Sequence, residues 1–131
     1  MWVMILKDRI FEGKSIAVDI DGTLFIGDYK YPNLGYLNTT LIECLNKFRE
    51  LGGIVVIWSL REKTSPLGDI LTPALDYLKQ GGLEWDYVNE NIPCEVRKYN
   101  DDPRKVATTY YIDDRSIDML SLIKLVYGSD V

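Results

Sequence analysis

Short apolar runs that end abruptly in a polar side chain recur along this chain. Residues 16–18, 54–58 and 110–112 are each followed by an acidic or hydroxyl residue. A run of this length is typical of a buried parallel strand. Between the first two runs, apolar residues recur at helical spacing from 41 to 51, and Gly52-Gly53 predicts the end of that helix. The order strand, helix, strand predicts a βαβ unit, and therefore an α/β fold with a parallel sheet.

Weaker patterns predict the elements that follow. A second helix is expected to begin at Pro66 or Asp69 and to end at Gly81-Gly82, and residues 85–88 are a candidate for a short strand. Residues 89–102 are expected to form a polar loop. The C-terminal part is expected to contain a helix over 116–123 and a last strand over 125–127.

Three further segments carry loop or edge signals. Residues 25–36 contain two glycines and a proline, which is the composition of a loop or a short hairpin. Residues 1–6 are apolar but too short to span a membrane, so we expect an edge strand or an arm on the core. Residues 11–14 are expected to turn into the first strand.

Composition narrows the class of protein. A chain of 131 residues that is 47% hydrophobic and 27% charged predicts one globular domain spanning 1–131. The net charge of −5 disfavours nucleic acid as a partner, although a local basic patch stays open. Cys44 and Cys94 have no histidine to join them in a zinc site. We expect two buried, reduced cysteines, a cytoplasmic location and no membrane partner.

The largest group of candidate functional residues directly follows the first predicted strand. Asp19 and Asp21 are two residues apart, so brief extended geometry would project both carboxylates to one side. Carboxylates held this close repel each other, and a hard divalent cation such as Mg²⁺ relieves that repulsion. Gly22 allows a sharp turn, and Thr23 offers a hydroxyl and an amide beside the acids. The alternative is a turn that merely ends a strand.

Residues 15–25 resemble motif I of the haloacid dehalogenase (HAD) superfamily of phosphohydrolases, an apolar strand followed by Asp-x-Asp-Gly-Thr. Residues 54–59 resemble motif II, and residues 110–114 resemble motif IV, which ends in paired acids. Lys105 stands where small members carry the lysine of motif III. The resemblance implies a three-layer α/β/α, Rossmann-like (HAD-like) fold, with residues 25–36 as a flap. The segments between the motifs leave no room for a cap domain.

The same resemblance assigns roles to the acidic residues. Asp19 would be the nucleophile that forms an aspartyl-phosphate, and Asp21 would be the general acid and base. Mg²⁺ would be bound by Asp19, by the backbone carbonyl of Asp21 and by Asp113, with Asp114 as a further ligand or acting through water. The alternative for Asp113 and Asp114 is an exposed turn held by surface ion pairs.

Further residues would bind the phosphate or the rest of the substrate. Ser59, the amide of Leu60, and Gly22 and Thr23 would donate hydrogen bonds to the phosphate. Lys105 would neutralise its charge, with Lys98 as a rival, although lysines are mostly solvated. Arg61 is expected at the rim in contact with substrate, or else in a surface ion pair. Ser59 has the simpler alternative of ending a strand.

These inferences lead to three alternative functions. The first is a Mg²⁺-dependent phosphatase acting on a phosphorylated small molecule. The second is a metal- or phosphate-binding module without turnover, because a fold does not guarantee chemistry. The third is a 3′-phosphatase that processes nucleic-acid ends, which the acidic charge disfavours. Without a cap, the site is expected to be open in the monomer, unless a second subunit of a homo-oligomer supplies the missing wall.

Overall fold

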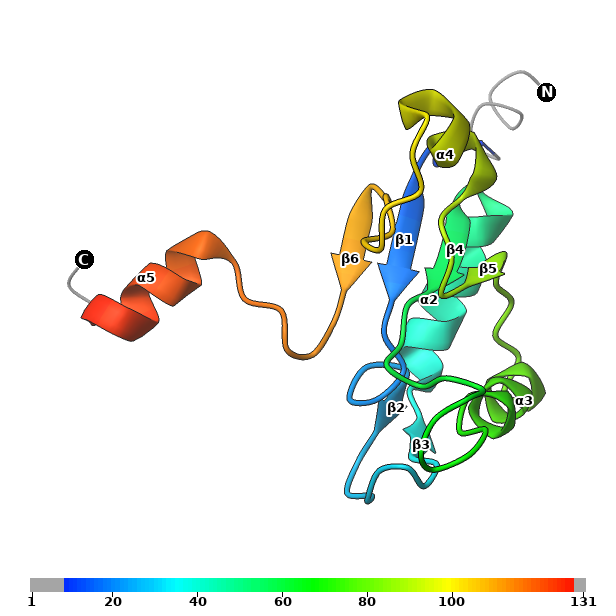
Figure 1. Ribbon diagram of the computed structural model, residues 1–131, viewed down its shortest axis with the longest axis vertical. Helices are drawn as coiled ribbons and strands as arrows, with labels where there is room; N and C mark the ends of the chain where they lie inside the picture. The colour runs from blue at the N-terminus through cyan, green and yellow to red at the C-terminus, as the bar shows by residue number, and fades with distance from the viewer. Residues whose placement is uncertain (1–8, 129–131) are drawn as a thin grey trace.

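The computed structural model describes residues 9–128, and its centre is a four-stranded sheet in which neighbouring strands run parallel. β1 (Ser15–Val18) lies between β4 (Ile54–Ile57) and β6 (Tyr110–Ile112), and β5 (Tyr87–Val88) pairs with the outer side of β4 (Figure 1). The strand order is β5-β4-β1-β6. The predicted α/β fold with a parallel sheet is therefore confirmed.

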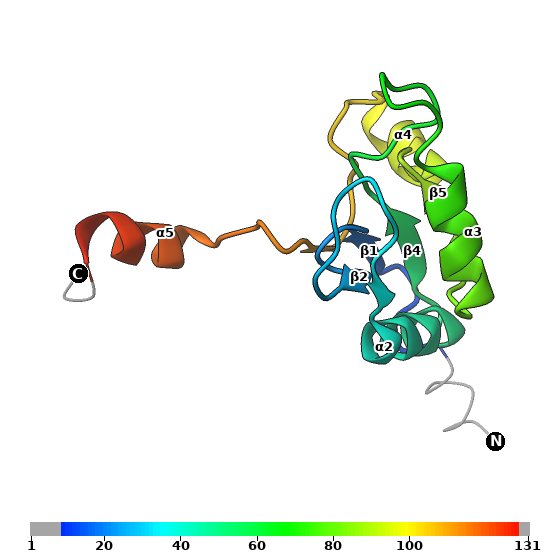
Figure 2. The ribbon, with the colours of Figure 1, turned by 90° about the horizontal axis from the view of Figure 1, so that it is seen from below.

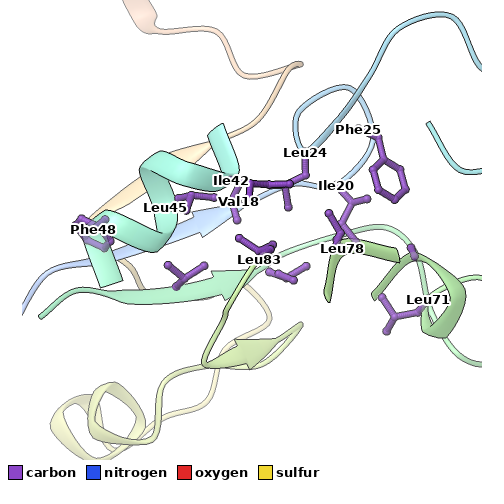
Figure 3. Packing of buried hydrophobic residues seen from close by; sticks show 13 residues of the cluster. Val18, Ile20, Leu24, Phe25, Ile42, Leu45, Phe48, Leu71, Leu78 and Leu83 are labelled. Atoms are coloured by element: carbon purple, nitrogen blue, oxygen red, sulfur yellow. The ribbon is translucent and has the colours of Figure 1, made fainter. Parts of the chain in front are cut away.

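Helices α2 (Thr39–Glu50) and α3 (Thr72–Gln80) bury their apolar sides against one face of the sheet. The register pairs Val18 with Ile57, so these two side chains face the helices together. Figure 3 shows this core, whose buried members are Val18, Ile20, Leu24, Phe25, Ile42, Leu45, Phe48, Val55, Ile57, Leu71, Ala74, Leu78 and Leu83. Helix α4 (Pro93–Tyr99) lies on the other side of the sheet from α2 (Figure 2).

Residues 25–36 form a hairpin, one of the two forms expected for this segment. β2 (Phe25–Ile26) pairs antiparallel with β3 (Tyr36–Leu37), and the remaining residues of 25–36 form the connecting loop. Asn38 then caps α2 by accepting a hydrogen bond from the Leu41 amide at 3.2 Å. The same side chain donates to the Thr23 carbonyl at 3.0 Å, which ties the base of the hairpin to the start of the helix.

Two expectations for the second half of the chain are wrong. Residues 89–102 are not all loop, because Pro93 begins the seven-residue helix α4. The expected strand over 125–127 belongs to helix α5 (Met119–Tyr127), which begins after Asp118 rather than at Ser116. Asp118 accepts a hydrogen bond from the Ser121 amide at 2.8 Å, a local cap that outweighs the strand character of the apolar run. Helix α5 projects away from the sheet (Figures 1 and 2).

Smaller boundaries also shift. Helix α3 begins at Thr72, and the Asp69 carboxylate accepts hydrogen bonds from the amides of Leu71 and Thr72 just before it. Cys44 and Cys94 are exposed rather than buried, because α2 turns Ile42, Leu45 and Phe48 inward and α4 buries no residue. The turn expected over 11–14 is present. The arm expected over 1–6 lies outside the described residues.

No helix within residues 9–128 is long and apolar enough to cross a membrane.

Candidate functional site

Three of the predicted site residues follow neighbouring parallel strands at the same edge of the sheet. Asp19 follows β1, Ser59 comes two residues after β4, and Asp113 follows β6. The ladder continues past the strand ends, because the Asp19 amide donates to the Ile112 carbonyl at 3.0 Å and the Trp58 amide donates to the Val18 carbonyl at 2.9 Å. The carboxyl edge of a parallel sheet is where α/β proteins place their ligands.

Asp19, Asp113 and Asp114 each bring a carboxylate oxygen within 4.8 Å of the other two. Asp19 is half-buried, and the other two are exposed. Burial raises the pKa of the Asp19 carboxyl to about 6, and the negative charges of Asp113, Asp114 and Asp21 add to the rise. Three carboxylates whose negative charges repel one another suit a hard divalent cation such as Mg²⁺, which binds oxygen ligands.

Gly22 and Thr23 connect the two acidic segments. The Asp114 amide donates to the Thr23 hydroxyl at 3.1 Å, and Thr23 is 7% exposed. Gly22 has φ of +79°, and a Cβ there would overlap the Asp114 carboxylate. Its amide already donates to the Tyr29 hydroxyl at 3.2 Å. In this structure both residues therefore support Asp114 and Tyr29, whereas the sequence suggested that they bind phosphate.

Asp21 is not one of the three clustered carboxylates, and it pairs with Arg61. The Arg61 Nε and Nη2 groups donate to the two Asp21 carboxylate oxygens, each at 2.8 Å. Arg61 is 1% exposed, so the expectation that it lies at the rim in contact with substrate is wrong. The physical reason is that Asp21 and three backbone carbonyls accept every hydrogen of its guanidinium, which makes burial tolerable.

Ser59 is placed by a residue that the sequence analysis missed. The Ser59 amide donates to the Asn89 Oδ1 atom at 2.8 Å, and the Asn89 Nδ2 group donates to the Arg61 carbonyl at 3.1 Å. The Ser59 hydroxyl accepts from the Arg61 amide at 3.0 Å. Asn89 directly follows β5, so the rule that singled out the polar ends of the other strands would have found it.

The two lysines considered for the phosphate lie against aromatic rings. The Lys105 ammonium is 5.1 Å from the centre of the Tyr111 ring, and the Lys98 ammonium is 5.3 Å from that of Tyr99. Neither lines the cavity above the sheet edge. Within the part of the chain that the structure describes, the basic residues that do are Arg104 and Arg115.

The cavity itself measures about 1230 Å³. Its lining brings Asp19, Asp21, Ser59, Asp113 and Asp114 together with the aromatic residues Tyr29, Tyr31 and Trp58. Leu60, also in the lining, is 84% exposed, and Tyr31 is 43% exposed. The cavity is therefore open to solvent, in agreement with the expectation of an open site.

Comparison with known proteins adds support for the fold. No protein-family model and no curated protein matches the sequence. A solved structure described as the conserved protein coded by a locus from Bacteroides thetaiotaomicron is similar, with 26% identity and a TM-score of 0.63. The similarity covers 86% of this chain and 88% of that one. Its description states no activity, so it supports the α/β arrangement and no particular chemistry.

Proposed function

We propose that this protein is a Mg²⁺-dependent phosphohydrolase of the HAD type, acting on a phosphorylated small molecule. The observation that carries the proposal is the convergence of Asp19, Asp113 and Asp114 at the carboxyl edge of the parallel sheet. Asp19, Asp113, Asp114 and the backbone carbonyl of Asp21 would hold the ion. Bound there, Mg²⁺ supplies positive charge against the phosphate oxygens and the carboxylates.

The chain's own residues would carry the reaction in two steps. In the first, a carboxylate oxygen of Asp19 attacks phosphorus, the bond to the ester oxygen breaks, and Asp21 protonates the departing oxygen. In the second, Asp21 takes a proton from water, whose oxygen attacks the same phosphorus. The bond to Asp19 then breaks, and inorganic phosphate leaves. Asp21 lines the same cavity as Asp19, which suits this shared role.

The remaining lining would bind the substrate. The Ser59 hydroxyl and the Leu60 amide would donate to phosphate oxygens, which is supported by the position of both residues in the cavity lining after β4. Arg104 and Arg115 supply positive charge there, whereas Lys105 would first have to leave Tyr111. Tyr29, Tyr31 and Trp58 would contact the leaving group.

One observation favours the second candidate, a metal- or phosphate-binding module without turnover. The lysine expected to neutralise the phosphate lies against Tyr111 and not in the cavity lining. In such a module, the acidic cluster would still bind Mg²⁺, and Arg104 and Arg115 would still attract an anion.

Phosphate release from a panel of sugar phosphates, nucleotides and 3′-phosphorylated oligonucleotides separates the candidates. We expect turnover of small phosphomonoesters in MgCl₂ and none in EDTA. Asp19→Asn should abolish turnover, because an amide keeps the shape of the side chain but is not a nucleophile. Wild-type turnover in the Asn variant would overturn the covalent mechanism. Mg²⁺ binding without release of phosphate from any substrate would support the binding module.

A further inference from the structure

Arg61 is the most completely bonded buried side chain at the site. Its Nε and Nη2 groups donate to Asp21, and Nη2 also donates to the Asn33 carbonyl at 3.0 Å. Its Nη1 group donates to the carbonyls of Pro32 at 2.9 Å and Ile70 at 3.1 Å. These contacts use all five N–H donors of a guanidinium.

Two aromatic rings enclose the same group. The Arg61 Cζ atom lies 5.6 Å from the centre of the Phe25 ring and 5.1 Å from that of Tyr31. Phe25 is fully buried, so water is excluded from this side of the guanidinium. A lysine offers three donors from a single nitrogen and cannot reproduce a planar fork held between rings. The geometry is therefore specific to arginine.

Asp21 is held from a second direction as well. Its Oδ1 atom accepts from the Tyr29 hydroxyl at 2.8 Å in addition to Arg61. Burial, and then the hydrogen bond to Asp21, raises the pKa of Tyr29 to about 12, so the phenol stays protonated and keeps donating near neutral pH. Oδ2 accepts one hydrogen bond from the described residues, that from Arg61. This leaves a lone pair of Oδ2 available for a proton.

Besides Phe25, which lies in β2, four of the partners come from the connecting part of one segment, the flap loop (residues 25–36). Tyr29, Tyr31, Pro32 and Asn33 all belong to it, and each touches Arg61 or Asp21. The flap loop and the Asp21 carboxylate are therefore fixed by the same guanidinium. If the flap loop moved away, Arg61 would lose two carbonyls and a ring, and its hold on Asp21 would weaken with them.

We propose that Arg61 is a positioning residue that couples the flap loop to Asp21, so that the carboxylate is presented to the leaving group only while the flap loop is in place. The expected effect on catalysis rests on the proposed function. The expected effect on the flap loop rests on the contacts of Arg61 alone.

The catalytic consequence can be tested with two substrates that differ in their need for a proton. Nitrophenolate leaves phosphorus without protonation, whereas the alkoxide of glycerol 2-phosphate requires it. We compare kcat/KM, which reports the steps up to the departure of the first product. Arg61→Lys should lower kcat/KM for glycerol 2-phosphate by roughly 100-fold and for p-nitrophenyl phosphate by less than about 10-fold, given the usual size of general-acid catalysis.

Arg49→Lys is the matched control, because Arg49 also pairs with two carboxylates, Glu84 and Asp86, but lies outside the cavity. It should leave both values unchanged. An equal loss of kcat/KM on the two substrates in Arg61→Lys would overturn the inference, because a merely structural role predicts that result. If Arg61→Lys does not fold, Tyr29→Phe replaces it, because this variant removes one hydrogen bond to Asp21. It too should lower kcat/KM more for glycerol 2-phosphate than for p-nitrophenyl phosphate.

The structural consequence can be tested without turnover. Hydrogen exchange of the flap-loop amides should be at least about tenfold faster in Arg61→Lys than in Arg49→Lys, because two carbonyl contacts of that loop are lost. Equal exchange in the two variants would overturn the coupling. If the wild type releases no phosphate from either substrate, the proposed function fails, while this measurement still decides the role of Arg61.

Discussion

The backbone amide of Asp114 donates a hydrogen bond of 3.1 Å to the hydroxyl of Thr23, which joins the two acidic segments of the site. Thr23 is buried, so the hydroxyl has little access to water that could replace this partner. The bond holds the backbone of Asp114 beside Gly22, where its carboxylate can join the acidic cluster.

Replacing Thr23 by Val should therefore lower both stability and metal affinity. The substitution keeps the shape of the side chain but removes the acceptor of the Asp114 amide. The cost should be about 1 kcal/mol, because Asp114 is exposed and water can replace part of the bond. Urea denaturation in EDTA measures the first effect, and titration with Mg²⁺ measures the second. Thr23→Ser, which keeps the hydroxyl, is the control. Equal stability of the Val and Ser variants would contradict this role.

The raised pKa of Asp19 predicts how stability depends on pH in the absence of metal. Between about pH 4 and pH 6, the folded protein keeps a proton on Asp19 that the unfolded chain has released. The free energy of unfolding should therefore fall as the pH rises through this range. Solvent screening at this half-exposed site reduces the effect to roughly 1 kcal/mol.

The Asp19→Asn variant has no titratable group at this position. Its free energy of unfolding should therefore not fall over this pH range. In EDTA, the Tm of the Asn variant should exceed that of the wild type by about 3–6 °C near neutral pH and should match it near the acidic end of the range. Mg²⁺ should then raise the Tm of the wild type more than that of the variant, because the ion compensates the ionised carboxylate. Parallel pH profiles of the two proteins would show that Asp19 is not the group responsible.

The basic residue that binds phosphate can be identified by comparing Arg104 with Lys105. Arg104 lines the cavity, and Lys105 lies against Tyr111. Arg104→Gln should raise KM by roughly tenfold, the size expected for a hydrogen bond to a charged group. Lys105→Gln should change KM less than about twofold, as expected for an exposed charge. The reverse result would restore Lys105 to the role that the sequence suggested.

The sequence left a homo-oligomer open as an alternative to an open monomeric site, and the exposed side of helix α5 makes it testable. Met119 and Leu125 on this helix are 78% and 74% exposed, and the helix projects from the sheet (Figure 1). The β6 edge of the sheet, where Tyr110 is half exposed, offers an aromatic surface on which such a helix could pack. Because helix and surface occur on one chain, two copies can exchange them reciprocally.

We therefore expect the wild type to elute above its monomer mass in sizing with light scattering. The double variant Leu122→Ser, Leu125→Ser should shift the protein towards the monomer, because it removes apolar area from α5 and leaves the site untouched. Lys124→Ser, on the same helix, serves as the control. A monomeric wild type would rule out the exchange.

Much of the fold was predictable because its signals are local. The runs at 16–18, 54–58 and 110–112 are apolar over strand length and end in polar side chains, so both the strands and the gathering of Asp19, Ser59 and Asp113 at one edge followed from the sequence. The apolar spacing from 41 to 51 and the glycines at 52 and 53 likewise placed helix α2 to within a residue or two. Helices α4 and α5 were the exceptions. Helix α4 lies in a polar stretch that resembles a loop, and the apolar run of α5 suits a strand and a helix equally.

The tertiary structure alone decided which partners the charged residues found. The sequence indicates that Arg61, Lys105 and Asp21 each carry a charge that needs water or a partner, but it does not indicate which. Forty residues separate Arg61 from Asp21, and the carbonyls of the flap loop attract a guanidinium only after the hairpin has formed. Lys105 lies on Tyr111 because β6 is an edge strand with an exposed ring. Such pairings depend on distances across the fold, and local patterns of polarity do not encode them.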